Sequence, residues 1–216
     1  MLITLWSVKG GSGVSVVAAG LASVFASDGG AGANGSLLVD LGGDQPALLG
    51  VAQPDNPGVR DWLAAPHGDA AALRRLEIEV GPSMGLLPAG SAAGWPPERE
   101  AALVEVLGSD GRAVVVDGAL GAAPAASLAA ADVSLLVVRP CYLALRRAVR
   151  HGVHADGVVL VEEAGRALDA VDVSRALGLP VLCTVEADPS VARAVDAGLL
   201  AARLPRAFAR SLRSIA

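Results

Sequence analysis

The chain of 216 residues is long enough for one sizeable α/β domain and too short for two comfortable ones. Hydrophobic residues make up 53% of the sequence and aromatic residues only 3%, which predicts a core of aliphatic side chains on helices and buried strands. The net charge of -5 argues against a surface that is basic all over, so contact with nucleic acid would need a local patch.

The first half of the chain opens with an apolar run, a glycine-rich stretch and a run rich in alanine and leucine, which together predict strand, loop and helix. Further on, a polar, proline-punctuated region extends from Asp44 to His67. The elements expected in this half are a strand over 2–8, a helix over 13–30, a strand over 36–43, a short helix over 58–65, a helix running into a strand over 71–80, and a strand over 84–90.

From residue 96 onward, helices and strands alternate regularly. The expected elements are a helix over 96–112, a strand over 113–121, a helix over 123–131, a strand over 133–140, a helix over 142–152, a strand over 156–163, a helix over 167–178, a strand over 180–186, and two closing helices. Such alternation implies right-handed crossovers and a parallel sheet. The sequence therefore predicts one α/β domain over residues 1–216, with helices on both faces of a mostly parallel sheet.

The stretch SVKGGSGVS, residues 7–15, has the context of a phosphate-binding loop because it follows a strand and opens a helix. Gly10, Gly11 and Gly13 would let the backbone wrap around an anion that the N–H groups of the helix N-terminus bind. Ser15 offers a hydroxyl to Mg²⁺. The alternative is a tight turn without a ligand, which the strand, loop and helix context disfavours.

Two further features point to the same edge of the sheet. The strands over 36–43 and 113–121 contain Asp40 and Asp117 near their ends, and ligands bind at the carboxyl ends of strands in such sheets. Lys9, within the glycine-rich stretch, is the only lysine among 17 basic residues. Its compact ammonium is therefore a candidate for a specific role, although a single residue can also arise by chance.

These residues resemble the ParA/MinD family of P-loop ATPases, whose deviant Walker A motif reads K-G-G-x-G-K-[ST]. The resemblance implies a single-domain P-loop NTPase fold, ATP or ADP with Mg²⁺ as the cofactor, and a homodimer in which the signature lysine reaches the phosphates of the partner subunit. The motif departs from the family at the P-loop lysine. It stands here as Lys9, Gly10, Gly11, Ser12, Gly13, Val14 and Ser15.

Two later motifs extend the resemblance toward the metal side of a nucleotide site. LLVDLGGDQPALLG resembles the family's D-x-D motif, with Asp40 as the first aspartate and Gly42 in place of the second. AVVVDGALG resembles Walker B, with Asp117 as the carboxylate on the Mg²⁺ side and Gly121 near the γ-phosphate. The resemblance thus implies catalytic roles for Lys9, Asp40 and Asp117, and Mg²⁺ ligation by Ser15 and Asp117.

The base side of the site is also represented, so the resemblance covers nearly the whole chain. LLVVRP, which ends at Arg139 and Pro140, resembles the strand before the base pocket, and VEADPSVARAVDAG resembles the stretch after the last strand. Glu162 stands where the family often has an asparagine that helps to recognise adenine. The phrases GVRDWLAAP and ARAVDAGLL resemble the pilus-assembly CpaE/TadZ branch more than plasmid-partition ParA.

The departures at Val14, Gly42 and Glu162 fall on three parts of one site, which predicts an impaired ATPase. A lysine bonded to phosphate contributes roughly 1.5–3 kcal/mol, so its loss weakens binding by about 10- to 150-fold. Hydrolysis suffers more, because phosphoryl transfer depends on electrostatic stabilisation of the transition state. Asp44 would replace the missing second aspartate only if its loop were rebuilt.

The resemblance implies a positioning protein of cell division, chromosome partition or pilus localisation, working through dimerisation or a protein partner with weak or absent ATP hydrolysis. Three alternatives remain open at this point. One is a pseudo-ATPase scaffold without a nucleotide function, and a second is a working ATPase in which Lys9 takes over from the missing lysine. A metabolic enzyme related to dethiobiotin synthetase is the third, although no substrate-binding motif supports it.

Two basic segments are candidates for contact with other molecules. At helical spacing, the C-terminal segment RLPRAFARSLRSIA places Leu204, Phe208, Leu212 and Ile215 on one face and arginines on the other. This pattern suits either a helix packed on the sheet, which we favour, or a basic amphipathic helix on an anionic membrane. The other segment carries Arg146, Arg147 and Arg150, which suit a solvated helix face better than DNA binding at this net charge.

The expected location is the cytoplasm, with the inner face of the membrane as the alternative that the C-terminal helix leaves open. No apolar run reaches the roughly 18 uncharged residues of a membrane span, and MLITLWSVKGG lacks both a basic n-region and a cleavage site. The two cysteines and three histidines have no metal-ligand spacing. No metal site is therefore predicted from them.

Overall fold

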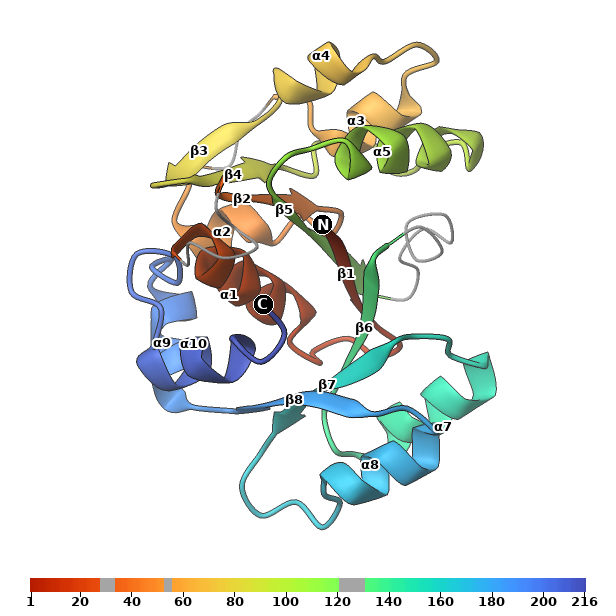
Figure 1. Cartoon of the computed structure of the whole chain (residues 1–216), viewed down its shortest axis with the longest axis vertical. Helices are drawn as coiled ribbons and strands as arrows, with labels where there is room; N and C mark the ends of the chain where they lie inside the picture. The colour runs from red at the N-terminus through yellow and green to blue at the C-terminus, as the bar shows by residue number, and fades with distance from the viewer. Residues whose placement is uncertain (28–33, 53–55, 121–130) are drawn as a thin grey trace.

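The computed structural model describes residues 1–27, 34–52, 56–120 and 131–216. Within these residues, eight strands form one sheet in the order β3-β4-β2-β5-β1-β6-β7-β8 (Figure 1). Every neighbouring pair is parallel except β3 with β4. The strands are β1 (Leu2–Ser7), β2 (Ser36–Asp40), β3 (Ile78–Gly81), β4 (Met84–Leu87), β5 (Ala113–Leu120), β6 (Val133–Val138), β7 (Gly157–Glu162) and β8 (Val181–Glu186).

Helices cover both faces of the sheet, as the sequence predicted (Figure 1). The sequence missed α2, because this five-residue helix is too short to show a hydrophobic period and contains a proline in its first turn. The helix expected over 123–131 lies almost entirely outside the described residues. The helices are α1 (Val14–Ser27), α2 (Gln45–Leu49), α3 (Val59–Ala64), α4 (Ala70–Arg74), α5 (Glu98–Gly108), α7 (Tyr142–His151), α8 (Ala170–Leu177), α9 (Pro189–Asp196) and α10 (Arg206–Leu212).

The central strand β1 shows how the core is divided. Its side chains alternate between the two faces, so Ile3 and Leu5 pack in the cluster that contains α1, whereas Leu2 packs with α3 and α5 and Trp6 with α7 and α8. All four are buried, and burial of such a side chain contributes about 1.5–3 kcal/mol. β1 therefore lies covered on both faces, and its carboxyl end is fixed by both layers.

The C-terminal helix α10 packs on α1, which decides between the two interpretations of its amphipathic sequence. Phe208 and Leu212 are buried against Gly20 of α1, where an added Cβ would collide with both side chains. Leu204 and Ile215 also pack partly buried against this cluster. The apolar face of α10 is thus part of the core and is not a free surface for a membrane.

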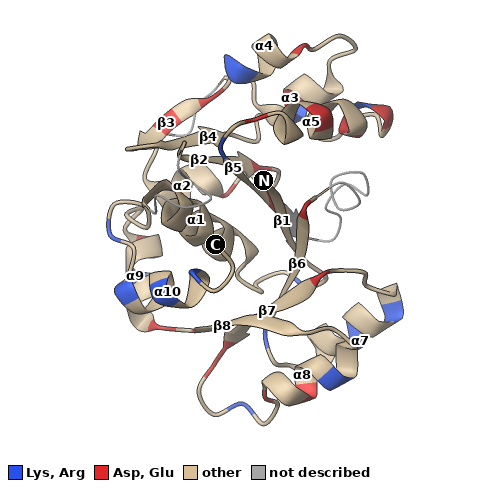
Figure 2. Cartoon of the chain, in the orientation of Figure 1, with Lys and Arg blue, Asp and Glu red and all other residues tan. Residues whose placement is uncertain are grey.

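The surface of α7 carries the arginine cluster predicted from the sequence. Arg146, Arg147 and Arg150 are all exposed, and Figure 2 shows basic positions along α7 as well as on α9 and α10.

No helix in the described part of the chain has the length and apolar character needed to cross a bilayer.

Candidate functional site

The site lies where three strands of the sheet end. After β1 the chain crosses β5 to form β2, and after β5 it crosses to the other side of β1 to form β6, so β1 marks the point where strand order reverses. Ligands of open parallel sheets bind outside the carboxyl ends of strands at such a point. Asp40 and Asp117 are register partners on β2 and β5 at this edge.

The glycine-rich loop between β1 and α1 is held in shape by its own hydroxyl groups. Ser7 Oγ and Ser12 Oγ are 2.8 Å apart, and Ser12 Oγ donates to the carbonyl of Lys9 at 2.7 Å. Gly11 and Gly13 have φ angles of 73° and 97°, which favour glycine. The loop therefore has a fixed open curve whose peptide groups lie at the start of a helix.

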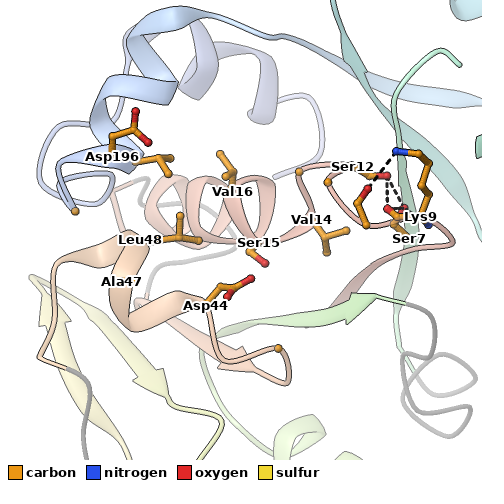
Figure 3. Close-up of a pocket in the computed structure, with 16 residues that line it drawn as sticks. Ser7, Lys9, Ser12, Val14, Ser15, Val16, Asp44, Ala47, Leu48 and Asp196 are labelled. Atoms are coloured by element: carbon orange, nitrogen blue, oxygen red, sulfur yellow. Dashed lines mark hydrogen bonds between the residues drawn. The ribbon is translucent and has the colours of Figure 1, made fainter.

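This loop forms one wall of a cavity of about 650 Å³ that continues along α1 toward α2 and α9 (Figure 3). The ammonium of Lys9 donates to the carbonyl of Gly10 at 3.3 Å in an exposed contact. All seven residues of the Walker A-like motif line the cavity. The lining residues are Ser7, Lys9, Gly10, Gly11, Ser12, Gly13, Val14, Ser15, Val16, Gly42, Asp44, Ala47, Leu48, Val195, Asp196 and Gly198.

Charge within this cavity is unusual for a site that would hold a polyphosphate. Lys9 is the one cation among the described lining residues, and two carboxylates, Asp44 and Asp196, line the same cavity. Val14, which the sequence resemblance aligns with the P-loop lysine, is the first residue of α1, where it is 7% exposed and packs with the core. A valine side chain supplies neither charge nor a hydrogen-bond donor, so the donor groups that this wall of the cavity offers to an anion are backbone N–H groups and Lys9.

Asp40 is turned into the loop that follows β2 and does not line the cavity. Its carboxylate accepts hydrogen bonds from the backbone N–H groups of Gly42 (2.9 Å), Gly43 (2.6 Å) and Gln45 (3.1 Å). Burial, together with the nearby charge of Asp117, raises the pKa of Asp40 from 3.8 to about 6, while the three backbone hydrogen bonds oppose that rise. This geometry makes Asp40 the anchor of the loop.

Asp117 is fully buried, and a residue that sequence reasoning missed holds it. The side-chain amide of Gln45 donates to Asp117 Oδ2 at 2.7 Å and to the backbone carbonyl of Ser15 at 2.9 Å. Both of these groups are acceptors, so the orientation of the amide follows from its partners. Gln45 Oε1 is buried and has no hydrogen-bond partner among the described residues.

A second cavity of about 510 Å³ adjoins the first at Gly13 and Val16. It lies between α1, α9, α10 and the ends of β7 and β8, and its wall is mainly apolar, with Phe208 contributing an aromatic ring. Arg139 lines it from the end of β6 and forms an ion pair with Glu163. Pro140 is buried beside Arg139 but does not line this cavity.

Glu162 lies at the rim of a further cavity, next to its register partner Glu186 on β8. Two carboxylates side by side at the strand ends make this rim acidic. Glu162 does not line the apolar cavity that adjoins the glycine-rich loop, whereas Glu186 does. The departure at this position therefore alters the charge of the outer rim.

The residues of the cavity wall offer room for an anion at the glycine-rich loop and oxygen ligands for a divalent cation beside it. The open curve at Gly11, where an added Cβ would meet no atom within 4 Å, leaves room for an anion. Ser15 and Asp44 offer oxygen ligands of the kind that Mg²⁺ prefers at the cavity wall, and Figure 3 shows both side chains directed toward the same space. Asp117 is the buried carboxylate of the set, with Oδ2 already bound by Gln45.

The structure thus brings together most of the residues predicted from the sequence. The motif from Lys9 to Ser15 forms the cavity wall, and Asp44, which follows the missing second aspartate, also lines it. Asp40 and Asp117 lie together but are bound by the β2–α2 segment, and Gly121 falls outside the described residues. Gln45 lies within the stretch LLVDLGGDQPALLG, but the motif matched there assigns a role only to its aspartates, so no chemistry could be assigned to this glutamine from the sequence.

Comparisons with known proteins support the fold. No protein-family model matches the chain, and no curated protein sequence matches it. Among solved structures, MinD of Aquifex aeolicus is 18% identical with a TM-score of 0.77, covering 100% of this chain and 96% of that one. MinD of Pyrococcus horikoshii in complex with Mg-ADP is 20% identical with a TM-score of 0.74, covering 99% of this chain and 93% of that one.

A ParA-family ATPase of Chlorobium tepidum is also similar, at 16% identity and a TM-score of 0.66, with 100% of this chain and 98% of that one covered. At these identities, the structural similarity shows the fold alone. The chain has the P-loop NTPase fold of the MinD and ParA ATPases, with one eight-stranded, mostly parallel sheet among the described residues.

Proposed function

We propose that this chain is a member of the ParA/MinD family and acts as a positioning protein, in cell division, chromosome partition or pilus localisation, with weak or absent ATP hydrolysis. It works through a homodimer or a docked protein partner. The proposal is supported by the fold shared with MinD and ParA ATPases and by a phosphate-loop cavity at the carboxyl ends of β1, β2 and β5. A chain in the structure of a MinC:MinD complex of Aquifex aeolicus has the same fold, which favours docking of a protein partner.

The proposed loss of activity rests mainly on the burial of Val14, which the sequence resemblance aligns with the P-loop lysine. With Lys9 as the one cation among the described lining residues, and Asp44 and Asp196 lining the same cavity, the cavity gives little electrostatic stabilisation to a triphosphate. Cellular nucleotide would still bind weakly through the backbone N–H groups of the loop. The transition state for phosphoryl transfer, which needs more positive charge, would be stabilised least.

When bound, Mg²⁺ would neutralise phosphate charge. Ser15 is the residue that would hold it, with Asp44 as a further oxygen donor and Asp117 as the buried carboxylate of the site. Lys9 would bind phosphate oxygens once its contact with the carbonyl of Gly10 is released. The two serines of the loop would keep its peptide N–H groups oriented toward the anion.

The test is magnesium-dependent turnover of ATP by the purified protein, measured beside Ser15→Ala and Asp117→Ala. We expect turnover at the level of the two variants. Clear turnover in the wild type that either substitution abolishes would overturn the proposed loss of hydrolysis. Lys9→Ala would then show whether Lys9 has taken over from the missing lysine.

The second candidate is a scaffold that uses the same surfaces without any nucleotide, and the acidic charge of the cavity favours it. One property distinguishes the two candidate functions, namely whether the oligomeric state of the protein changes when nucleotide is added. Association that changes when an ATP analogue is added supports the nucleotide-linked protein, and association that is indifferent to nucleotide supports the scaffold.

A further inference from the structure

The segment that joins β2 to α2 is held by hydrogen bonds to the carboxylate of Asp40, at its own start. Asp40 gathers the N–H groups of Gly42, Gly43 and Gln45 around one carboxylate, at 2.9, 2.6 and 3.1 Å. Hydrogen bonds to an ionised acceptor are stronger than those between neutral groups. Two N–H groups of the β2–α2 loop, residues 40–44, and the N–H of Gln45 at the start of α2 thus have a partner before any ligand enters the neighbouring cavity.

Gln45 connects this loop to two other parts of the site. Its side chain, which has no exposed surface, donates both amide hydrogens, one to Asp117 on β5 and one to the carbonyl of Ser15 on α1. Its backbone N–H donates to Asp40 on β2. One residue therefore joins the loop to the strand that carries Asp117 and to the helix that begins at the glycine-rich loop.

The far end of α2 is held as well. Leu48 and Leu49 are buried, and the carbonyl of Leu48 accepts a hydrogen bond from the backbone of Leu200 at 3.4 Å. Gly50 and Gly198 approach so closely that a Cβ on Gly198 would lie 3.0 Å from the Cα of Gly50. Both ends of the segment from Asp40 to Gly50 are consequently fixed to the rest of the fold.

A ligand shifts a conformational equilibrium only by binding the two states with different affinity. In this chain the N–H groups of Gly42, Gly43 and Gln45 already have a partner in Asp40, and Asp44 lines the cavity. Filling the cavity therefore offers the loop no new partners for the N–H groups that Asp40 holds. A second arrangement would have to break the bonds of Gln45 and leave the buried Asp117 without that donor, which is costly.

We propose that Gln45 is a positioning residue that fixes Asp117, α1 and the β2–α2 loop in one arrangement, so that this loop stays unchanged when the phosphate cavity is filled. This inference deepens the proposed function, on whose nucleotide site its ligand-bound half rests. The β2–α2 loop therefore keeps one conformation in this chain and does not change in response to bound nucleotide.

Amide hydrogen exchange, followed by NMR, tests the inference at Gly42, Gly43 and Gln45. In the free wild type these amides should exchange slowly, and saturation with a nonhydrolysable ATP analogue plus Mg²⁺ should leave their rates within about threefold. Gln45→Met, which keeps the length of the side chain but removes the amide, should speed exchange at the three amides by about tenfold or more.

Leu49→Ala is the matched control, because it removes a buried side chain from the same helix and leaves the hydrogen bonds of the Gln45 amide to Asp117 and Ser15 in place. It should raise exchange at the loop and in the core strand β5 together, whereas Gln45→Met should raise exchange at the loop beyond that in β5. If Gln45→Met fails to fold, Gln45→Asn replaces it, since the shorter amide cannot reach both acceptors.

Two results would overturn the inference. One is a gain in protection of about tenfold at the wild-type loop amides on binding nucleotide. The other is an equal effect of Gln45→Met and Leu49→Ala at the loop relative to β5. If no nucleotide binds at all, the proposed function fails, while slow exchange in the wild type and rapid loop exchange in Gln45→Met would still support the role of Gln45.

Discussion

Phe208 of α10 lies directly against the backbone of Gly20 in α1, and Leu212 packs beside it. A Cβ on Gly20 would stand 2.7 Å from Leu212 Cδ1 and closer still to the ring of Phe208. Gly20 sits in the middle of a helix, where glycine is normally unfavourable. Its presence is explained by the C-terminal helix, which needs this close approach in order to bury its apolar face.

Gly20→Ala should therefore destabilise the protein by about 1–3 kcal/mol, because the added methyl group overpacks the contact with α10. Urea unfolding followed by circular dichroism measures the change. Gly108→Ala is the matched control, since a Cβ at the end of α5 meets no atom within 4 Å. A neutral or stabilising effect of Gly20→Ala would show that α10 does not pack on α1 as described.

The buried face of α10 also predicts no binding to anionic membranes. The wild-type protein should remain in the supernatant when it is sedimented with liposomes that contain anionic lipid, because Phe208 and Leu212 are not exposed. Arg210→Glu reverses an exposed charge on the same helix and should change nothing. Co-sedimentation of the folded wild type that Arg210→Glu weakens would contradict this prediction.

A lysine placed at position 14 of the glycine-rich loop should strengthen nucleotide binding. Val14 lines the cavity at the first residue of α1, so the stem of a lysine there would stay buried while its ammonium reaches the cavity. Val14→Lys should lower the dissociation constant of an ATP analogue by about 10- to 150-fold. Isothermal titration gives the value.

Val16→Lys controls for added charge alone, because Val16 lines the same cavity two residues further along the helix. It should gain much less than Val14→Lys, since long-range attraction at this distance is screened by solvent. Equal gains from the two variants would mean that general charge, and not the specific position of Val14, limits nucleotide binding.

Asp40 predicts a defined pH dependence of stability. Because its pKa is raised from 3.8 to about 6 in the fold, the native state binds more protons than the unfolded state between these values. The stability associated with protonated Asp40 is present at low pH and is lost as the pH rises through about 6. The difference corresponds to about 3 kcal/mol.

Urea unfolding of the wild type and of Asp40→Asn, measured at about pH 4.5 and pH 7.5, isolates this contribution, because the other carboxyl groups are common to both proteins. Asn has one acceptor oxygen and should lower stability at both pH values. The loss should be larger at low pH, where the wild type gains from the protonated carboxyl. Parallel pH profiles of the two proteins would show that Asp40 is not perturbed.

The fold was predictable from the sequence because alternating apolar strands and helices leave few arrangements other than a doubly wound parallel sheet. The loop from Lys9 to Ser15 was also predictable, since glycines between a strand and a helix have a specific backbone use. Helix α2 was missed because a five-residue helix that begins with Gln45 and Pro46 is stabilised by tertiary contacts and shows no period.

The role of Gln45 was missed for a related reason. Its partners are 30 and 72 residues away in the chain, and nothing in the local sequence identifies a glutamine as a bridge. For the C-terminal helix the sequence favoured packing on the sheet but left membrane binding open, because an amphipathic pattern alone does not distinguish the two. Gly20, close in space but far in sequence, supplied the missing information.

The measurement that tests the central claim most directly is isothermal titration of the wild type with a nonhydrolysable ATP analogue plus Mg²⁺, with light scattering on the same samples. We predict weak binding through the loop from Lys9 to Ser15, accompanied by a shift from monomer to dimer. No binding, with an oligomeric state indifferent to nucleotide, would contradict the nucleotide-linked account and leave the scaffold.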